Sequence, residues 1–208
     1  MAYEFDVSPL LDRQKIKEVV TYFKGYFKNP IERVKSIPDW DWIISIATLG
    51  VFSAAGGVAR GIFEANFLTI ILSFIFVPIG SVIGVAIVSG FFYYTFFFFF
   101  NRELVYRQLF TAVFICSVPS LCLQALASIA SPFLLLGVMA TLFLMIVCFV
   151  ENFQLPRKPI SKLMAGIFII YFASWVLNVI QFTNEEEKIQ KRISTESLDI
   201  LERDLQNK

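Results

Sequence analysis

The chain has 208 residues, of which 57% are hydrophobic and only 17% are charged, and it contains 24 Phe but no His. A soluble domain usually has about 25% charged residues, and here the apolar residues form long uninterrupted runs instead of periodic stripes. This composition excludes an ordinary soluble domain and predicts an all-α, polytopic membrane helical bundle. The net charge of +1 says nothing about partners, because the charged residues are segregated to the ends and short loops.

Residues 1–42 are predicted to form amphipathic helices on the cytoplasmic side of the membrane. Ser8-Pro9 has the residue types of a helix start, with Ser as the N-cap and Pro at the first helical position. Downstream, apolar and aromatic residues recur at three- and four-residue spacing, and lysines, among them Lys24 and Lys28, point in other directions. A basic helix of this kind either lies in the lipid interface or docks on the protein's own cytoplasmic face. The sequence leaves both alternatives open.

A second, shorter helix is predicted before the first span. Asn29-Pro30 provides its cap and its first residue, and Pro38 is expected to end it. Trp40 and Trp42 follow immediately before an apolar run, a position typical of the lipid headgroup level. The candidate interfacial residues are Lys24, Lys28, Trp40 and Trp42.

Five transmembrane spans are predicted within the bundle of residues 43–182. They cover about 43–59, 67–100, 109–130, 133–150 and 163–182. Residues 183–208 form a highly charged tail with a loose apolar stripe at helical spacing. This tail is interpreted either as an amphipathic helix that pairs with a copy of itself or a partner, or as a plain solvated helix.

Glycines at four-residue spacing occur in the first two spans. Gly57 and Gly61 form one such pair, and Gly80 and Gly84 form the other. This spacing lets two helix backbones approach closely. It favours packing inside the bundle over a dedicated dimer face. Residues 60–66 are expected to be a short connection between the two spans.

The run 67–100 has no charged side chain and decides the number of crossings. As one helix it would extend about 50 Å, against about 30 Å of hydrocarbon. It is either a single crossing kinked at Pro78 or a hairpin that turns there and gives six spans. The segment 67–77 is much shorter than the roughly 20 residues of a normal span, and a turn at Pro78 would have no polar side chain nearby. A single kinked crossing is therefore preferred.

Pro119 is predicted to kink the third span, because proline removes one backbone hydrogen bond from a helix. Ser117, Ser120 and Gln124 lie nearby in the sequence and could satisfy the released groups. Together with the four glycines, Pro78 and Pro119 are the candidate helix-packing and kink residues.

Lysine and arginine counts predict a cytoplasmic N-terminus. Models with five and with six spans both place 12 basic residues on the side of the N-terminus and 6 on the other side. The positive-inside rule therefore sets the orientation of the chain but does not choose between the two models. Hydrophobic length has to make that choice.

The residue inventory argues against an enzyme. Nucleophilic catalysis by Ser or Cys usually needs a His, and the chain has none. No metal-ligand spacing, phosphate-binding loop or nucleic-acid-binding pattern is present either. We therefore predict no catalytic, cofactor-binding or metal residues and no nucleic-acid partner.

Transport is the alternative function. Ion-coupled carriers usually place an ionisable side chain at membrane depth, and none of the five predicted spans contains Asp, Glu, Lys, Arg or His. A channel or a protein that moves lipid needs no buried charge. A cavity shaped by the kinks at Pro78 and Pro119 would serve either.

The order of segments resembles the Ypt-interacting-protein (Yip) family. The residues that carry this resemblance are Lys28-Asn29-Pro30-Ile31-Glu32-Arg33-Val34 with Pro38 and Trp40, and Tyr106-Arg107-Gln108-Leu109-Phe110 followed by Pro119. The resemblance covers roughly residues 28–182. It implies a small five-span membrane protein with a cytosolic N-terminus, acting in membrane traffic by association with other proteins.

The chain differs from the eukaryotic Yip pattern. It has neither a long acidic N-terminal region nor an Asp-Leu-Xaa-Gly-Pro motif near the first span, so binding of a Rab-type GTPase is not expected. It is more similar to the prokaryotic branch, which implies the cytoplasmic membrane of a prokaryote. The expected function is that of a non-enzymatic, membrane-organising or trafficking-type scaffold. Its expected partners are the lipid bilayer and another copy or a sister membrane protein.

Overall fold

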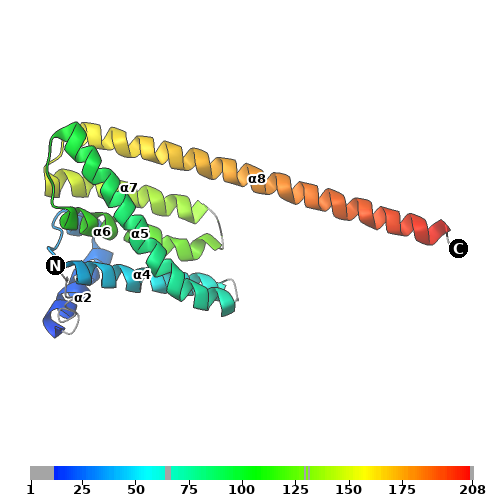
Figure 1. The fold of residues 1–208 in the computed structure, drawn as a ribbon, viewed down its shortest axis with the longest axis horizontal. Coiled ribbons are helices and arrows are strands. Elements are labelled where there is room, and N and C mark those ends of the chain that lie inside the picture. Colours follow the sequence, from blue (N-terminus) through cyan, green and yellow to red (C-terminus); the bar gives the residue numbers. More distant parts are fainter. Residues whose placement is uncertain (1–11, 64–66, 129, 131, 207–208) are drawn as a thin grey trace, which may run out of the picture. The chain divides into compact units, whose positions relative to one another are not determined.

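The computed structural model describes residues 12–63, 67–128, 130 and 132–206 (Figure 1). These residues form helices and short connections and include no strand. The α-helices are α2 (Arg13–Lys28), α3 (Pro30–Val34), α4 (Trp42–Phe63), α5 (Phe67–Phe100), α6 (Tyr106–Gln124), α7 (Pro132–Phe153) and α8 (Arg157–Gln206). A 3₁₀ turn, η1, covers Ala125–Ser128.

Five of these helices are long and apolar enough to cross a membrane: α4, α5, α6, α7 and, within α8, Arg157–Gln181. The all-α fold with five spans is therefore confirmed. The chain divides into two compact units, residues 1–164 and 165–208. The first contains α2 to α7, and the second consists of helix α8 from residue 165 onward.

Asn29 both ends α2 and begins α3. Its N–H donates to the Gly25 carbonyl at 3.0 Å, and its side chain accepts from the N–H of Glu32 at 3.3 Å. The Asn side chain thus caps α3, and Pro30 occupies the first turn, where no N–H is needed. The second helix is shorter than predicted, since it ends at Val34 and not at Pro38.

Helix α2 begins at Arg13. Its N-cap is Asp12, whose carboxylate accepts from the Gln14 N–H at 2.9 Å. The predicted start at Ser8-Pro9 lies outside the described residues.

Helix α5 runs unbroken through Pro78, so the six-span hairpin alternative is wrong. In Figure 1, α5 crosses the neighbouring helices of its unit at a marked angle. Tilt is the usual way in which a hydrophobic helix longer than the membrane is accommodated. The helix ends at Phe100. Asn101, the next residue, adopts φ 48°, and the Arg102 N–H donates to the Phe96 carbonyl at 3.3 Å. Asn tolerates this left-handed conformation better than most residues.

Several predicted boundaries are wrong. Helix α4 continues to Phe63, so residues 60–63 of the expected connection at 60–66 are helical, and α6 ends at Gln124 instead of near residue 130. The basic residues between the predicted fourth and fifth spans, from Arg157 onward, belong to α8. This helix continues to Gln206, so the predicted span at 163–182 and the predicted tail at 183–208 form one helix. Pro159 did not prevent this, because the first N–H groups of a helix need no partner within it.

Two pairs of helices in the first unit come into close backbone contact at glycines. A Cβ atom built on Gly61 would lie 2.9 Å from the Ile70 nitrogen, and one on Gly57 would lie 3.2 Å from the Ser73 carbonyl oxygen. These two positions therefore bring α4 against α5. In the same way, a Cβ atom on Gly137 would lie 3.0 Å from the Ser120 Cα, which brings α7 against α6.

The second glycine pair, Gly80 and Gly84, lies elsewhere. A Cβ atom at either position would meet nothing within 4 Å. Gly80 and Gly84 thus face open space on α5, and the two glycine pairs have different surroundings despite their identical spacing.

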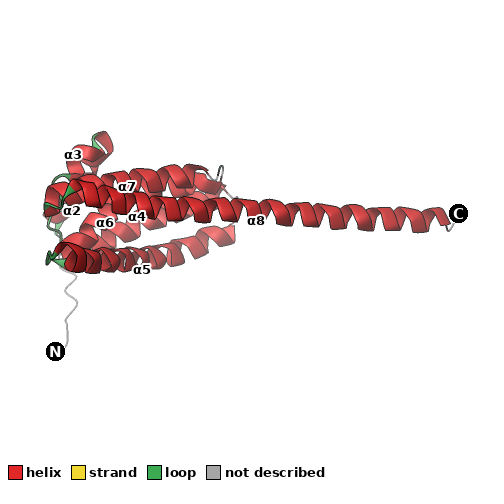
Figure 2. Ribbon diagram, turned by 90° about the horizontal axis from the view of Figure 1, so that it is seen from above, coloured by secondary structure: helices red, strands yellow, loops and turns green. Residues whose placement is uncertain are grey.

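Helix α6 is the centre of the first unit, since it packs against α4, α5 and α7. Its buried residues occupy every direction around the helix: Leu109, Phe110, Thr111, Ala112, Val113, Phe114, Ile115, Cys116 and Val118. The connections from α5 to α6 and from α7 to α8 lie at the same end of the unit as α2 and α3 (Figures 1 and 2). We call α2 and α3 the N-terminal cap.

Candidate functional site

An aromatic cluster docks the N-terminal cap on the bundle. Tyr22, Phe23 and Tyr26 of α2 are buried. The Phe23 ring lies 4.5 Å from the Phe52 ring and 6.1 Å from the Phe114 ring, centroid to centroid, which joins α2 to α4 and α6. Of the two alternatives for the basic helix, docking on the protein is therefore realised. The opposite side of α2 carries exposed basic residues.

A hydrogen bond from α2 accounts for Pro119. Proline has no N–H, so a proline at position 119 leaves the Ile115 carbonyl without its helical partner. The Tyr26 hydroxyl donates to that carbonyl oxygen at 3.1 Å in a buried position. Ser117 does not fill this role, since its hydroxyl donates to the Val113 carbonyl at 2.7 Å. The cap therefore supplies the hydrogen bond that Pro119 removes from α6.

The two buried tyrosines of α2 remain hydrogen-bond donors at any physiological pH. Burial raises the pKa of both Tyr22 and Tyr26 well above the ordinary range, because the charged phenolate would lose its hydration. The Tyr22 hydroxyl donates to the Arg33 carbonyl at 3.0 Å and so ties α3 to α2.

Four charged residues join α2, the segment just before α4 and the first turn of α6. The Lys15 ammonium lies 2.8 Å from the Asp41 carboxylate, and the Arg107 guanidinium lies 2.7 Å from Asp39 and 3.6 Å from Asp41. The hydrogen bond to Asp41 raises the pKa of Lys15. All four side chains are partly exposed, so each pair contributes little alone. We call this group the charged clasp.

The third attachment of the cap is Asn152 at the end of α7. Its amide Nδ2 donates to the Val34 carbonyl at 2.7 Å and to the Cys148 carbonyl at 2.9 Å, and its Oδ1 accepts from the Ile37 N–H at 3.1 Å. One side chain thereby binds both the end of α3 and the segment after it. The cap is consequently held at three separate places.

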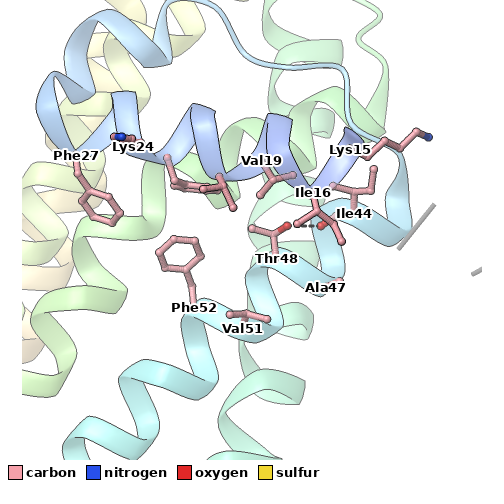
Figure 3. Close-up of a pocket in the computed structure, with 12 residues that line it drawn as sticks. Lys15, Ile16, Val19, Lys24, Phe27, Ile44, Ala47, Thr48, Val51 and Phe52 are labelled. Atoms are coloured by element: carbon pink, nitrogen blue, oxygen red, sulfur yellow. Dashed lines mark hydrogen bonds between the residues drawn. The ribbon is translucent and has the colours of Figure 1, made fainter. Parts of the chain in front are cut away.

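An apolar groove of about 570 Å³ lies between α2 and α4 (Figure 3). Figure 3 shows Ile16, Val19 and Phe27 of α2 facing α4, and Lys15 and Lys24 at its two ends. The hydroxyl of Thr48 in its wall donates to the Ile44 carbonyl at 2.6 Å. That hydroxyl is therefore already satisfied within the protein. We call this space the α2–α4 groove.

A second apolar groove of about 540 Å³ lies between α4 and α5 and borders Pro78. We call it the α4–α5 groove. The predicted cavity beside a proline is thus present at Pro78, and its walls are apolar. The other kink residue, Pro119, lies where α6 packs closely on Gly137 of α7.

A polar hollow of about 500 Å³ lies on the cap. We call it the polar hollow. Its lining residues come from α2, α3 and the segment before α4, and include Gln14, Lys17, Glu18, Thr21, Arg33 and Asp39. Exposed side chains of both charges meet there, as is common at surfaces that bind other proteins.

The predicted interfacial residues have different environments. Trp40 is buried, with its ring 5.3 Å from that of Tyr22, whereas Trp42 is 40% exposed and lies beside Phe110 of α6. Lys24 borders the α2–α4 groove, and Lys28 is exposed at the end of α2. Trp40 therefore belongs to the core beneath the cap and not to the surface.

Sequence reasoning missed the charged clasp and the role of Asn152. An alternation of acidic and aromatic residues at 39–42, just before an apolar run, was the available signal for the clasp. For the hydrogen bond between Tyr26 and Ile115 there was no signal, since these residues are 89 positions apart. Among the residues that the structure describes, no three His, Cys, Asp or Glu side chains gather as metal ligands would.

The fold and its features define a polytopic integral membrane protein with five candidate spans and a cap docked at one end of its bundle. Comparison with known proteins narrows this class no further, since no family model, no curated protein and no solved structure matches the chain.

Proposed function

We propose that this integral membrane protein is a non-enzymatic scaffold of the Yip type, which organises its membrane by binding proteins and lipid at the N-terminal cap. The supporting observation is that the cap is fixed to the bundle by buried aromatics, the charged clasp and Asn152, yet keeps the polar hollow and a basic face exposed. A fixed surface with preset charges binds a partner at a lower entropic cost than a flexible arm.

The positive-inside bias supports a cytoplasmic position for the cap, and the resemblance to the prokaryotic Yip branch supports the cytoplasmic membrane of a prokaryote. The proposed protein partner is a second copy of the chain or another membrane protein with a complementary surface, and no GTPase is proposed. The polar hollow offers Lys17, Glu18, Arg33 and Asp39 to such a partner.

A photo-crosslinking residue in place of Thr21 tests the scaffold proposal in intact membranes. Thr21 is exposed and borders the polar hollow, so we expect one reproducible protein adduct, identified by mass spectrometry. Adding Lys17→Glu should weaken this adduct, because it reverses a charge in the hollow, whereas Lys158→Glu on α8 should not. The same crosslinker at Met139, which is 51% exposed on α7, provides the background.

Identical adduct patterns from Thr21 and Met139, or adducts insensitive to Lys17→Glu, would remove the support for this proposal.

A second candidate function is the movement of lipid, and the α4–α5 groove beside Pro78 favours it. In reconstituted vesicles, a lipid-moving protein would transfer fluorescent phospholipid between leaflets faster than protein-free vesicles do. The scaffold proposal predicts no such acceleration, so this measurement separates the two candidates.

A further inference from the structure

The α2–α4 groove and the α4–α5 groove lie end to end along α4. Ala47 and Val51 line both of them. The residues of α4 that line the α4–α5 groove are Ala47, Gly50, Val51, Ala54, Ala55 and Val58. Their spacing places them on one face of the helix, and all of them are small or β-branched. This face leaves room for an extended apolar ligand.

The length of this face corresponds to one membrane leaflet. From Ala47 to Val58 the helix rises about 16 Å at 1.5 Å per residue. One leaflet contributes about 15 Å of a hydrocarbon core of about 30 Å. An acyl chain that enters beside α2 would therefore end near Phe74 and Pro78, which border the far part of the α4–α5 groove.

The charges favour an anionic headgroup at the mouth of the α2–α4 groove. Helix α2 carries five basic residues and one acidic residue. Lys15 is paired with Asp41, whereas no acidic side chain in the described part of the chain forms an ion pair with Lys24. Lys24 is thus the exposed cation that a lipid phosphate would meet. Basic helices at the membrane surface attract anionic lipids in this way.

We infer that the two grooves form one seat for an anionic phospholipid, with the phosphate at Lys24 and one acyl chain along α4. This inference rests on the proposed function, because it specifies which class of lipid the cap binds. The ligand is single and specific, in contrast to the lipids that cover the outer faces of the helices.

Two substitutions address the two parts of the seat. A Cβ atom at Gly50 would meet nothing within 4 Å, so Gly50→Trp fills the groove without pushing helices apart. Gly84→Trp is its control, because Gly84 is equally unobstructed and lies on α5 outside both grooves. Lys24→Glu removes the phosphate contact, and Lys158→Glu is a control for net charge.

Native mass spectrometry of the full chain, titrated with phosphatidylglycerol and phosphatidylcholine of identical acyl chains, tests the seat. We expect one tightly bound phosphatidylglycerol, lost in Gly50→Trp and kept in Gly84→Trp. Lys24→Glu should reduce the preference for phosphatidylglycerol by at least about fivefold, the effect of one basic residue near an anionic surface. Lys158→Glu should leave it unchanged.

Wild-type lipid binding by Gly50→Trp, or equal losses in Lys24→Glu and Lys158→Glu, would overturn the inference. A change of oligomeric state in Gly50→Trp alone would also overturn it, because a second copy would then occupy the grooves. If Gly50→Trp does not fold, a phosphatidylglycerol with a photoreactive acyl chain tests the unchanged protein, and labelling outside 47–58 and 74–78 contradicts the seat. The adduct at Thr21 does not depend on these variants, so the scaffold can stand if the seat fails.

Discussion

Gly61→Leu is expected to destabilise the bundle strongly, because it forces α4 and α5 apart at a close backbone contact. A Cβ atom at this position would lie 2.9 Å from the nitrogen and 3.0 Å from the Cα of Ile70. The obstacle is backbone, so it cannot move aside as the tip of a side chain can, and α4 and α5 must separate. Overpacking of a core costs about 1–3 kcal/mol, and we expect at least about 3 kcal/mol here. Equilibrium unfolding in detergent micelles or bicelles measures the loss.

Gly84→Leu is the matched control, since the same side chain enters open space there. It should change the free energy of unfolding by no more than about 0.5 kcal/mol, as surface substitutions usually do. Similar losses in the two variants would mean that leucine harms the helices in general and that the α4–α5 contact at Gly61 is unimportant.

Tyr26→Phe should cost about 1–3 kcal/mol of unfolding free energy, because it leaves the buried Ile115 carbonyl without a partner. The cost should depend on Pro119. In a Pro119→Ala background, the N–H of residue 119 can bond Ile115 as in any helix, so Tyr26→Phe should then cost less than about 0.5 kcal/mol. A double-mutant cycle from the four unfolding free energies measures this coupling.

Tyr22→Phe is the control for the cycle. The Tyr22 hydroxyl donates to the Arg33 carbonyl at 3.0 Å, which has no relation to Pro119. Its loss should therefore cost the same with Pro119 and with Ala at that position. If Tyr26→Phe is also independent of residue 119, the hydroxyl does not compensate for the proline.

The spans could be predicted from the sequence because hydrophobic length is a local property. The run 67–100 was assigned to one crossing since the segment 67–77 was too short to span alone, and α5 is one helix through Pro78. The boundaries failed where local signals were ambiguous. Pro159 and the neighbouring basic residues resemble a loop, yet they fit the first turn of α8.

The surroundings of side chains could not be predicted, because they depend on contacts between distant segments. Trp40 and Trp42 look equivalent in the sequence, but the docking of α2 buries only Trp40. Gly57 and Gly80 occur in the same four-residue pattern, and only Gly57 faces another backbone. The α2–α4 groove was equally hidden, since it needs α2 and α4 in place.

The burial of α6 has a consequence for how the protein enters its membrane. Among the five candidate spans α6 is the least hydrophobic, and it is also the most enclosed by its neighbours. A segment of this kind gains less from lipid than the others do. The Thr111 hydroxyl donates to the Arg107 carbonyl at 3.1 Å and also forms a hydrogen bond with the Ser45 hydroxyl, at 3.0 Å between α6 and α4. Stable integration of α6 during biogenesis therefore depends on helices made before and after it, which couples membrane insertion to tertiary assembly.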